Sequence, residues 1–199
     1  MSSCSIFGNS GVEIAPYEVL QSDGSIEIRH YEELLLVSTP MKGDLDKNEG
    51  AFNKLFRYIS GENKAATKVE MTAPVLINPE DSEGQKIAMT APVFMNQDES
   101  AEKWTMSFVL PSTFNYETAP RPTDTDVTLD KITDLTVAAI RFNGLLRNDN
   151  TQKQKSQLER WIADNGFRIT GSYKTAGYNP PWTLPNLRRN EVIIPVERQ

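Results

Sequence analysis

The sequence has very little cysteine and very little histidine, with one residue of each among 199. The single cysteine, Cys4, excludes a disulfide framework within the chain and any metal site built from several cysteines. The absence of a cluster of His, Cys and Asp disfavours a zinc site. A Cys–His catalytic pair is disfavoured as well, because His30 is far from Cys4 in sequence and Cys4 lies in a segment expected to be mobile.

Long apolar runs are also missing. No segment reaches the ~18 apolar residues that a membrane-spanning helix needs, and the apolar core of a signal peptide is absent. We therefore expect a cytoplasmic protein. One alternative stays open: Ser2-Ser3-Cys4 matches the remnant of a trimmed lipoprotein signal, with Cys4 as the lipidation site of a periplasmic protein.

Sequence motifs of the common catalytic sites are absent too. The chain has no Gly-x-Ser-x-Gly elbow, no Ser–His–Asp motif and no Walker loop. Neighbouring carboxylates such as Glu32 and Glu33 stand beside an expected turn and are typical of a surface. We therefore expect a protein that is not an enzyme.

What the chain does contain is typical of a globular protein, with 38% hydrophobic and 24% charged residues. Its 199 residues suffice for one domain with a sizeable core. The formal net charge of −6 disfavours nucleic acid or an anionic membrane surface as the main partner. We expect a soluble monomer, and the composition does not identify its ligand.

Two helices are predicted from apolar residues that recur with the helical period. The first is expected over residues 44–59 and the second from about 148 to 165, where Asn and Thr residues offer N-caps and Gly166 follows. The apolar stripes consist of Phe52, Leu55, Phe56 and Ile59 in the first helix, and of Leu158, Trp161 and Ile162 in the second. Strands are expected at 17–20, 25–31, 34–39, 68–72, 75–77, 86–90, 93–95, 104–110, 127–132, 135–142, 168–173 and 191–196.

The order strands–helix–strands occurs twice, on either side of a proline-containing loop at 111–122. Each helix has an apolar stripe too narrow to stand alone, so we expect the two halves to share one sheet. The predicted organisation is a flexible N-terminal arm over residues 1–15 and a single domain over 16–199. The repeated halves are expected at about 16–110 and 123–199.

One phrase is repeated literally: Met-Thr-Ala-Pro-Val stands at residues 71–75 and again at 89–93. Proline lacks the N–H that a sheet ladder needs, so each copy is predicted to mark a strand bend or edge. A hairpin through 78–85 would bring the two copies side by side. Met71 and Met89 fit core filler better than thioether ligands, since methionine packs well into irregular gaps.

This phrase belongs to a set of stretches that resembles the SOUL family of haem-binding proteins over nearly the whole chain, from Tyr17 to Val196. The other matching stretches are YEVL at 17–20, IRHY at 28–31, FNKLFRYI at 52–59, AAIRFNG at 138–144, GYNPPW at 177–182 and RRNEV at 188–192.

The resemblance implies an α+β fold: a distorted antiparallel β-barrel made of two pseudo-symmetric halves, each with one helix packed on the sheet. This agrees with the repeat found independently in the residue pattern. The fold also looks similar to the effector-binding domains of some bacterial drug-sensing regulators, which hold flat apolar molecules between their halves. Family members are described as binding haem or other tetrapyrroles without known catalysis.

A candidate haem site follows from the resemblance, residue by residue. In some family members the histidine at the position of His30 is proposed to be the axial ligand of the iron. Other members lack it and hold the porphyrin against the first helix. Glu49 departs from the basic residue expected near the propionates there. The residues implied are His30 for the metal, Phe52, Leu55 and Phe56 for the apolar floor, Arg57 for a propionate, and Tyr178 and Trp182 for the opposite wall.

Each of these residues also has a plainer interpretation. His30 fits a strand histidine hydrogen-bonded to a neighbour, the apolar stripe fits ordinary core, and Arg57 fits a solvated flank. Three functions therefore stay open. They are a tetrapyrrole carrier, buffer or sensor, a binding module for other flat amphipathic molecules, and a protein–protein interaction module.

Overall fold

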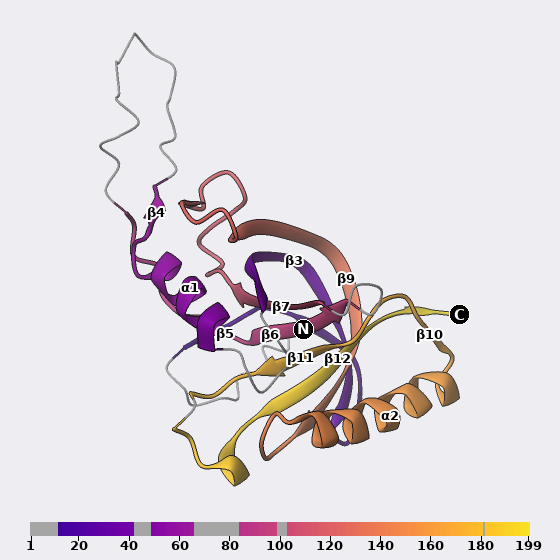
Figure 1. Cartoon of the computed structure of the whole chain (residues 1–199). Coiled ribbons are helices and arrows are strands. Elements are labelled where there is room, and N and C mark those ends of the chain that lie inside the picture. Colours follow the sequence, from indigo (N-terminus) through magenta and orange to yellow (C-terminus); the bar gives the residue numbers. More distant parts are fainter. Residues whose placement is uncertain (1–11, 42–48, 66–83, 99–102, 181) are drawn as a thin grey trace.

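The computed structural model of the chain describes residues 12–41, 49–65, 84–98, 103–180 and 182–199 (Figure 1). Two longer helices lie outside a strongly curved sheet. The elements are β1 (Glu13–Ile14), β2 (Glu18–Asp23), β3 (Ile26–Met41), α1 (Glu49–Ile59), β4 (Asn63–Lys64), β5 (Thr90–Ala91), β6 (Val93–Asp98), β7 (Lys103–Val109), β8 (Arg121–Pro122), β9 (Thr128–Phe142), α2 (Asn148–Asp164), β10 (Phe167–Ile169), β11 (Lys174–Gly177), the 3-10 helix η2 (Pro185–Leu187) and β12 (Asn190–Arg198).

Six of the described strands close into an antiparallel barrel. Around the ring the order is β3, β7, β6, β11, β12 and β9, and β9 pairs back with β3 to complete it. Two further strands extend the sheet, β2 beside β3 and β10 beside β12. The α+β class and the antiparallel barrel expected from the sequence are confirmed.

The barrel consists of two halves with the same strand order. In the first half β3 is followed around the ring by β7 and then β6. Read in the opposite direction around the ring, β9 of the second half is followed by β12 and then β11. Each half therefore places its last strand between its first and its middle strand. The halves join where β6 pairs with β11 and β3 pairs with β9, so they share one sheet as predicted.

The two helices cover different outer faces of the barrel. From α1, Leu55 packs against Val37 of β3 and Phe108 of β7 in one apolar cluster. From α2, Leu158 and Ile162 pack over β3, β9 and β12 in a second cluster. A third cluster, which includes Phe94, Val137 and Ile193, fills the barrel interior. No helix in the described part of the chain is long and apolar enough to cross a membrane.

The long strands β3 and β9 correct the sequence prediction of shorter, separate strands. The pair 25–31 and 34–39 is one strand, and so is the pair 127–132 and 135–142. The residue register between them continues without a shift through the region where a turn was expected. Glu32 and Glu33 are both exposed there. The ladder omits the pair Glu32 and Asp134, and Asp134 has a positive φ of 54°, so the strand changes which face it buries at a local irregularity.

The segment before residue 16 and the second repeated phrase meet in the structure. Glu13–Ile14 forms β1, which pairs in parallel with β5 at Thr90–Ala91. The N–H of Ala15 donates to the carbonyl of Ala91 at 2.9 Å, and Ala15 is buried. Val12, Ile14 and Ala15 therefore pack against the cluster in the barrel interior.

The second Met-Thr-Ala-Pro-Val copy marks a strand bend, as predicted. Pro92 separates β5 from β6, and of the strand expected at 86–90 only Thr90 is in a strand. Met89 is partly exposed. The first copy at 71–75, including Met71, lies outside the described residues, and so does most of the expected hairpin at 78–85.

Candidate functional site

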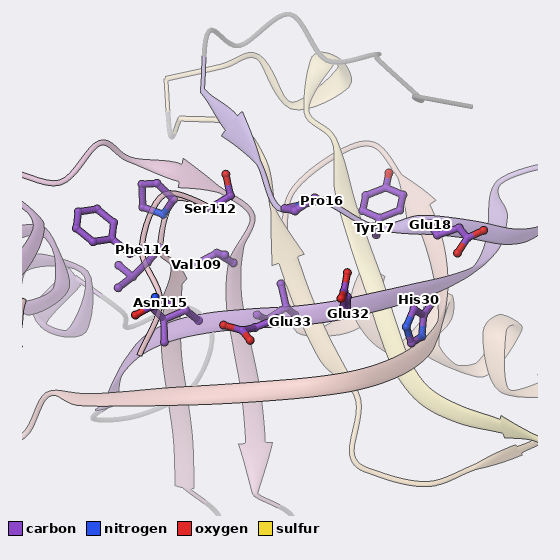
Figure 2. A pocket seen from close by; sticks show the side chains of 14 residues that line it. Pro16, Tyr17, Glu18, His30, Glu32, Glu33, Val109, Ser112, Phe114 and Asn115 are labelled. Carbon is purple, nitrogen blue, oxygen red and sulfur yellow. The ribbon is translucent and has the colours of Figure 1, made fainter. Parts of the chain in front are cut away.

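A pocket of about 690 Å³ opens between the start of β2, the middle of β3 and the segment after β7 (Figure 2). Its size lies within the range of ~300–1,000 Å³ that is usual for small-molecule sites. The lining residues are Pro16, Tyr17, Glu18, His30, Glu32, Glu33, Leu34, Leu35, Val109, Leu110, Pro111, Ser112, Phe114 and Asn115.

The pocket has an apolar floor and an acidic mouth. Leu34, Leu35, Val109 and Leu110 are buried and form the floor. Leu35 and Leu110 also belong to the cluster that packs against α1, so the pocket and the helix share a wall. The exposed lining residues at the mouth include the carboxylates Glu18, Glu32 and Glu33.

His30 lines this pocket and is partly exposed, with 28% of its side-chain surface accessible. Its Nδ1 lies 3.3 Å from Oγ1 of Thr136, the residue opposite it on β9. Its Nε2 lies 3.8 Å from a carboxylate oxygen of Asp134, which is beyond hydrogen-bond distance. The Thr136 contact can fix the ring orientation and leave Nε2 as the nitrogen able to bind a metal.

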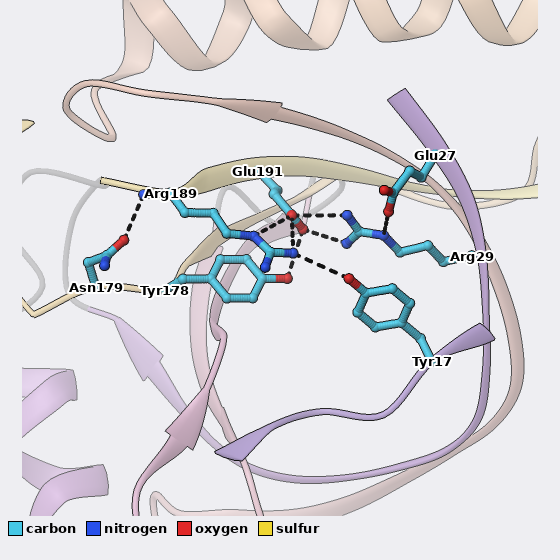
Figure 3. A network of polar contacts seen from close by, with 7 residues as sticks. All are labelled: Tyr17, Glu27, Arg29, Tyr178, Asn179, Arg189 and Glu191. Carbon is cyan, nitrogen blue, oxygen red and sulfur yellow. Dashed lines mark hydrogen bonds and ion pairs between the residues drawn. The ribbon is translucent and has the colours of Figure 1, made fainter. Parts of the chain in front are cut away.

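Tyr17 connects the pocket to a buried polar network inside the barrel (Figure 3). The Tyr17 hydroxyl accepts a hydrogen bond from Arg189 at 3.4 Å, and the Arg29 guanidinium stacks 4.4 Å from the centre of its ring. The ring also contacts Tyr31 at a centroid distance of 5.5 Å. These contacts hold the Tyr17 wall of the pocket in place.

Glu191 is the centre of that network. Arg29 donates to both of its carboxylate oxygens at 2.6 and 3.0 Å, and Arg189 donates twice to one of them at 2.9 and 2.7 Å. The Tyr178 hydroxyl donates a further bond at 2.8 Å. Arg29 and Glu191 lie almost completely inside the protein. A buried carboxylate is thus held by two cations and a phenol, an arrangement that satisfies all its acceptor sites.

The pKa shifts follow from this geometry. Burial alone would raise the pKa of the Glu191 carboxyl, but the hydrogen bond and charge of Arg29 and the charge of Arg189 outweigh it and hold that pKa below its usual value. Burial raises the pKa of Tyr178 well above the usual range and that of Tyr31 to about 12. Glu191 is therefore ionised and both phenols are neutral at physiological pH.

The stability contributed by Glu191 should be lost in acid. A carboxyl with a depressed folded pKa contributes fully above its unfolded pKa, about 4.3, and loses that contribution as the pH falls through the folded pKa. We expect the free energy of unfolding in urea to fall more steeply between pH 5 and pH 3 in the wild type than in Glu191→Gln. Equal slopes in the two proteins would remove Glu191 as the source.

The predicted helix residues lie on α1, on the other side of the wall that the helix shares with the His30 pocket. Leu55 is fully buried, and Phe52 is half-buried with its ring edge against Phe108 at 5.3 Å. Phe56 is half-exposed and stacks on Phe52 at 6.1 Å. Arg57 forms a surface ion pair with Glu62 at 3.2 Å. None of the four lines the pocket described above.

The two residues predicted for the opposite wall lie in different surroundings. Tyr178 is buried within the Glu191 network, under the guanidinium of Arg189 at 4.0 Å from its ring centre. Trp182 is 82% exposed on the loop before η2, near the exposed side chains of Leu184 and Leu187. The structure therefore separates the predicted site into a pocket, a helix face, a buried network and an exposed loop.

Sequence reasoning missed the pocket walls and gave Glu32 and Glu33 no role. No local signal places Glu18 there. Next to the turn the register pairs Asp23 with Ile26, and an irregularity between Val19 and Gln21 shifts it by one residue, so that Glu18 lies opposite His30. The remaining wall, from Val109 to Asn115, comes from a distant part of the chain and leaves no local signal. The described residues contain no group of three His, Cys, Asp or Glu side chains that could hold a metal ion.

Comparison with known proteins shows similarity along the whole domain. The family model described as SOUL heme-binding protein matches residues 12–83 and 77–195. Heme-binding protein 2 of Homo sapiens is 33% identical over 183 residues, which cover 90% of this chain and 82% of that protein.

Two solved structures share the fold at low sequence identity. A hydrolase from Listeria innocua superposes with a TM-score of 0.57 at 15% identity, covering 89% of this chain and 94% of that one. The C-terminal domain of EcmrR superposes with a TM-score of 0.53 at 14% identity, covering 92% and 99%. At these identities the likeness concerns the fold alone.

Proposed function

Because the chain belongs to the SOUL heme-binding protein family, we propose that it binds haem or a related tetrapyrrole in the pocket that His30 lines. The observation that carries this proposal is the position of His30. The chain's sole histidine lines a cavity of cofactor size with an apolar floor. A role as a carrier, buffer or sensor accords with such a site.

The residues of the pocket fit the iron and the macrocycle. A neutral imidazole is a common axial ligand of haem iron, and the iron would supply the redox and spectroscopic properties of the complex. Leu34, Leu35, Val109 and Leu110 offer the apolar surface that a flat macrocycle requires. The contact between Thr136 and Nδ1 of His30 is the kind of second contact that orients a metal-binding histidine.

The barrel interior offers much less space. A cavity between Tyr31, Phe94 and Ile193 measures about 10 Å³, which is near the lower limit for one water molecule. Apolar side chains and the Glu191 network fill the space between the halves. A flat ligand therefore fits the outer pocket, and the alternative of an amphipathic molecule held between the halves has no comparable support in the described residues.

We further propose that the protein is not an enzyme. Among the described residues, Asp134, His30 and Thr136 are arranged somewhat like a catalytic triad, but the Asp134 carboxylate is 3.8 Å from the ring and its side chain is 92% exposed. Nothing in these contacts holds the imidazole as a general base.

The cytoplasmic location and the monomeric state stay predictions. An interaction module, the third alternative, would use the exposed loop of Trp182, Leu184 and Leu187.

Titration of the purified protein with hemin tests the proposed function. We expect a saturable, sharpened Soret band and a changed, weaker spectrum in His30→Ala. Loss of a partner that merely orients a metal ligand costs about 10- to 100-fold in affinity, so loss of the ligand itself should cost at least as much.

Iron-free protoporphyrin is the matched control for that titration. Its fluorescence should report binding to the wild type and to His30→Ala with similar affinity, because no metal bond is involved. A spectrum of free or aggregated hemin at all protein concentrations would refute the proposed function. An unchanged spectrum in His30→Ala would exclude His30 as the ligand.

A further inference from the structure

The mouth of the His30 pocket carries more negative than positive charge. Glu18, Glu32 and Glu33 stand around it, and none of its lining residues is a lysine or an arginine. Figure 2 shows these carboxylates on the two strand segments that frame the pocket. Glu33 is paired with Lys131 at 2.6 Å, whereas Glu18 and Glu32 have no side-chain partner among the described residues.

This arrangement conflicts with the charge of haem itself. Haem carries two propionates, and a ligand seated on the apolar floor would bring its polar edge to the mouth beside Glu18 and Glu32. Like charges placed together across an interface disfavour binding, while opposite charges favour it. The carboxylates are not grouped closely enough to hold a metal ion, so an inorganic cation is not their natural partner.

We propose that the acidic mouth makes the pocket selective for flat tetrapyrrole-sized ligands whose edge is cationic, with neutral edges second and anionic edges last. This inference rests on the proposed function, since it concerns the same pocket. Glu18 and Glu32 are the residues that determine the selectivity. They act on the charge of the ligand's edge, while His30 and the apolar floor act on its metal and its ring.

Three forms of protoporphyrin test the inference, because they share one macrocycle and differ in edge charge. They are the free acid, which is dianionic, the neutral dimethyl ester, and the bis(2-aminoethyl) amide, which is dicationic. Fluorescence titration of the wild-type protein should give affinities that rise in that order, with at least about a tenfold difference between the extremes at low salt and a smaller one at high salt.

The double variant Glu18→Gln/Glu32→Gln should reduce that difference to about threefold or less, mainly by improving the binding of the dianion. A control variant with the same change in net charge, Glu159→Gln/Asp164→Asn on α2, should keep the wild-type ratio. It separates the action of the mouth from the overall charge of −6.

The outcomes are distinguishable. If the dianion binds as tightly as the dication, or if the mouth variant and the control variant change the ratio equally, the selectivity is refuted and the proposed function stands. If none of the three iron-free compounds binds, the selectivity is refuted, and the hemin titration decides the proposed function separately. A ratio that falls only in the mouth variant supports the inference.

Discussion

Replacing Glu191 with glutamine is expected to lower the free energy of unfolding by about 3–5 kcal/mol. The change removes the buried carboxylate that Arg29 and the partly buried Arg189 share, and leaves Arg29 with Glu27 as its remaining carboxylate partner, while the side-chain volume at position 191 is nearly unchanged. Removal of one partner of a buried ion pair is costly for this reason, although an intact pair adds little net stability over an apolar replacement. Urea unfolding followed by circular dichroism measures the difference.

The matched control for this variant is Glu197→Gln on the same strand. Glu197 also pairs with an arginine, Arg168, but both side chains are at least half exposed. Exposed pairs of this kind contribute about 0–1 kcal/mol. If the two variants lose equal stability, burial is not the cause and the importance assigned to the network is wrong. Tyr17 depends on the same network, so Glu191→Gln should also weaken porphyrin binding in the pocket.

The second large effect is expected for Leu55→Ala in α1. Leu55 is fully buried between α1 and the barrel, and truncation of a buried leucine typically costs about 2–5 kcal/mol through lost contacts and the cavity that remains. Leu55 does not line the His30 pocket but packs in the same cluster as Leu35 and Leu110 of its floor, so the folded variant should lose far less hemin affinity than His30→Ala. Thermal unfolding and a hemin titration at low temperature separate the two quantities.

Phe56→Ala, one residue away, is the control for helix position. Phe56 is half-exposed, so its loss should cost little stability. It is also the α1 residue best placed to contact a ligand on the helix surface. A large loss of hemin affinity in Phe56→Ala with unchanged binding in His30→Ala would move the site from the pocket to α1.

The local pattern of apolar residues was sufficient to predict the helices and strands that bury one face. The stripe of Leu55 and Ile59 predicted α1, and that of Leu158 and Ile162 predicted α2, because a helix on a sheet must bury one side. The repeated strand order was visible in the sequence as strands–helix–strands. The expected break between Tyr31 and Leu34 was wrong, because two adjacent exposed glutamates look the same in a turn and in a strand that changes its buried face.

Contacts between residues far apart in the sequence could not be predicted from local apolar patterns. Arg29 and Glu191 are 162 positions apart, and before folding each resembles an ordinary solvated charge. Tyr178 is predicted to contact a ligand, and in the structure its hydroxyl donates a hydrogen bond to buried Glu191, a contact that local sequence does not reveal. No periodicity encodes a contact between one end of the chain and the other.

The sequence by itself determined the family, the α+β barrel and its two helices, because motif order and apolar periodicity are local and additive along the chain. It also identified His30 as the one histidine available to a metal. Only the tertiary structure decided what surrounds His30. Pairing of β7 with β3 brings the segment from Val109 to Asn115 into the same pocket, and pairing of β2 with β3 places Glu18 opposite His30 at the mouth. A pocket is formed by the distances between segments, and those distances exist only once the chain has folded.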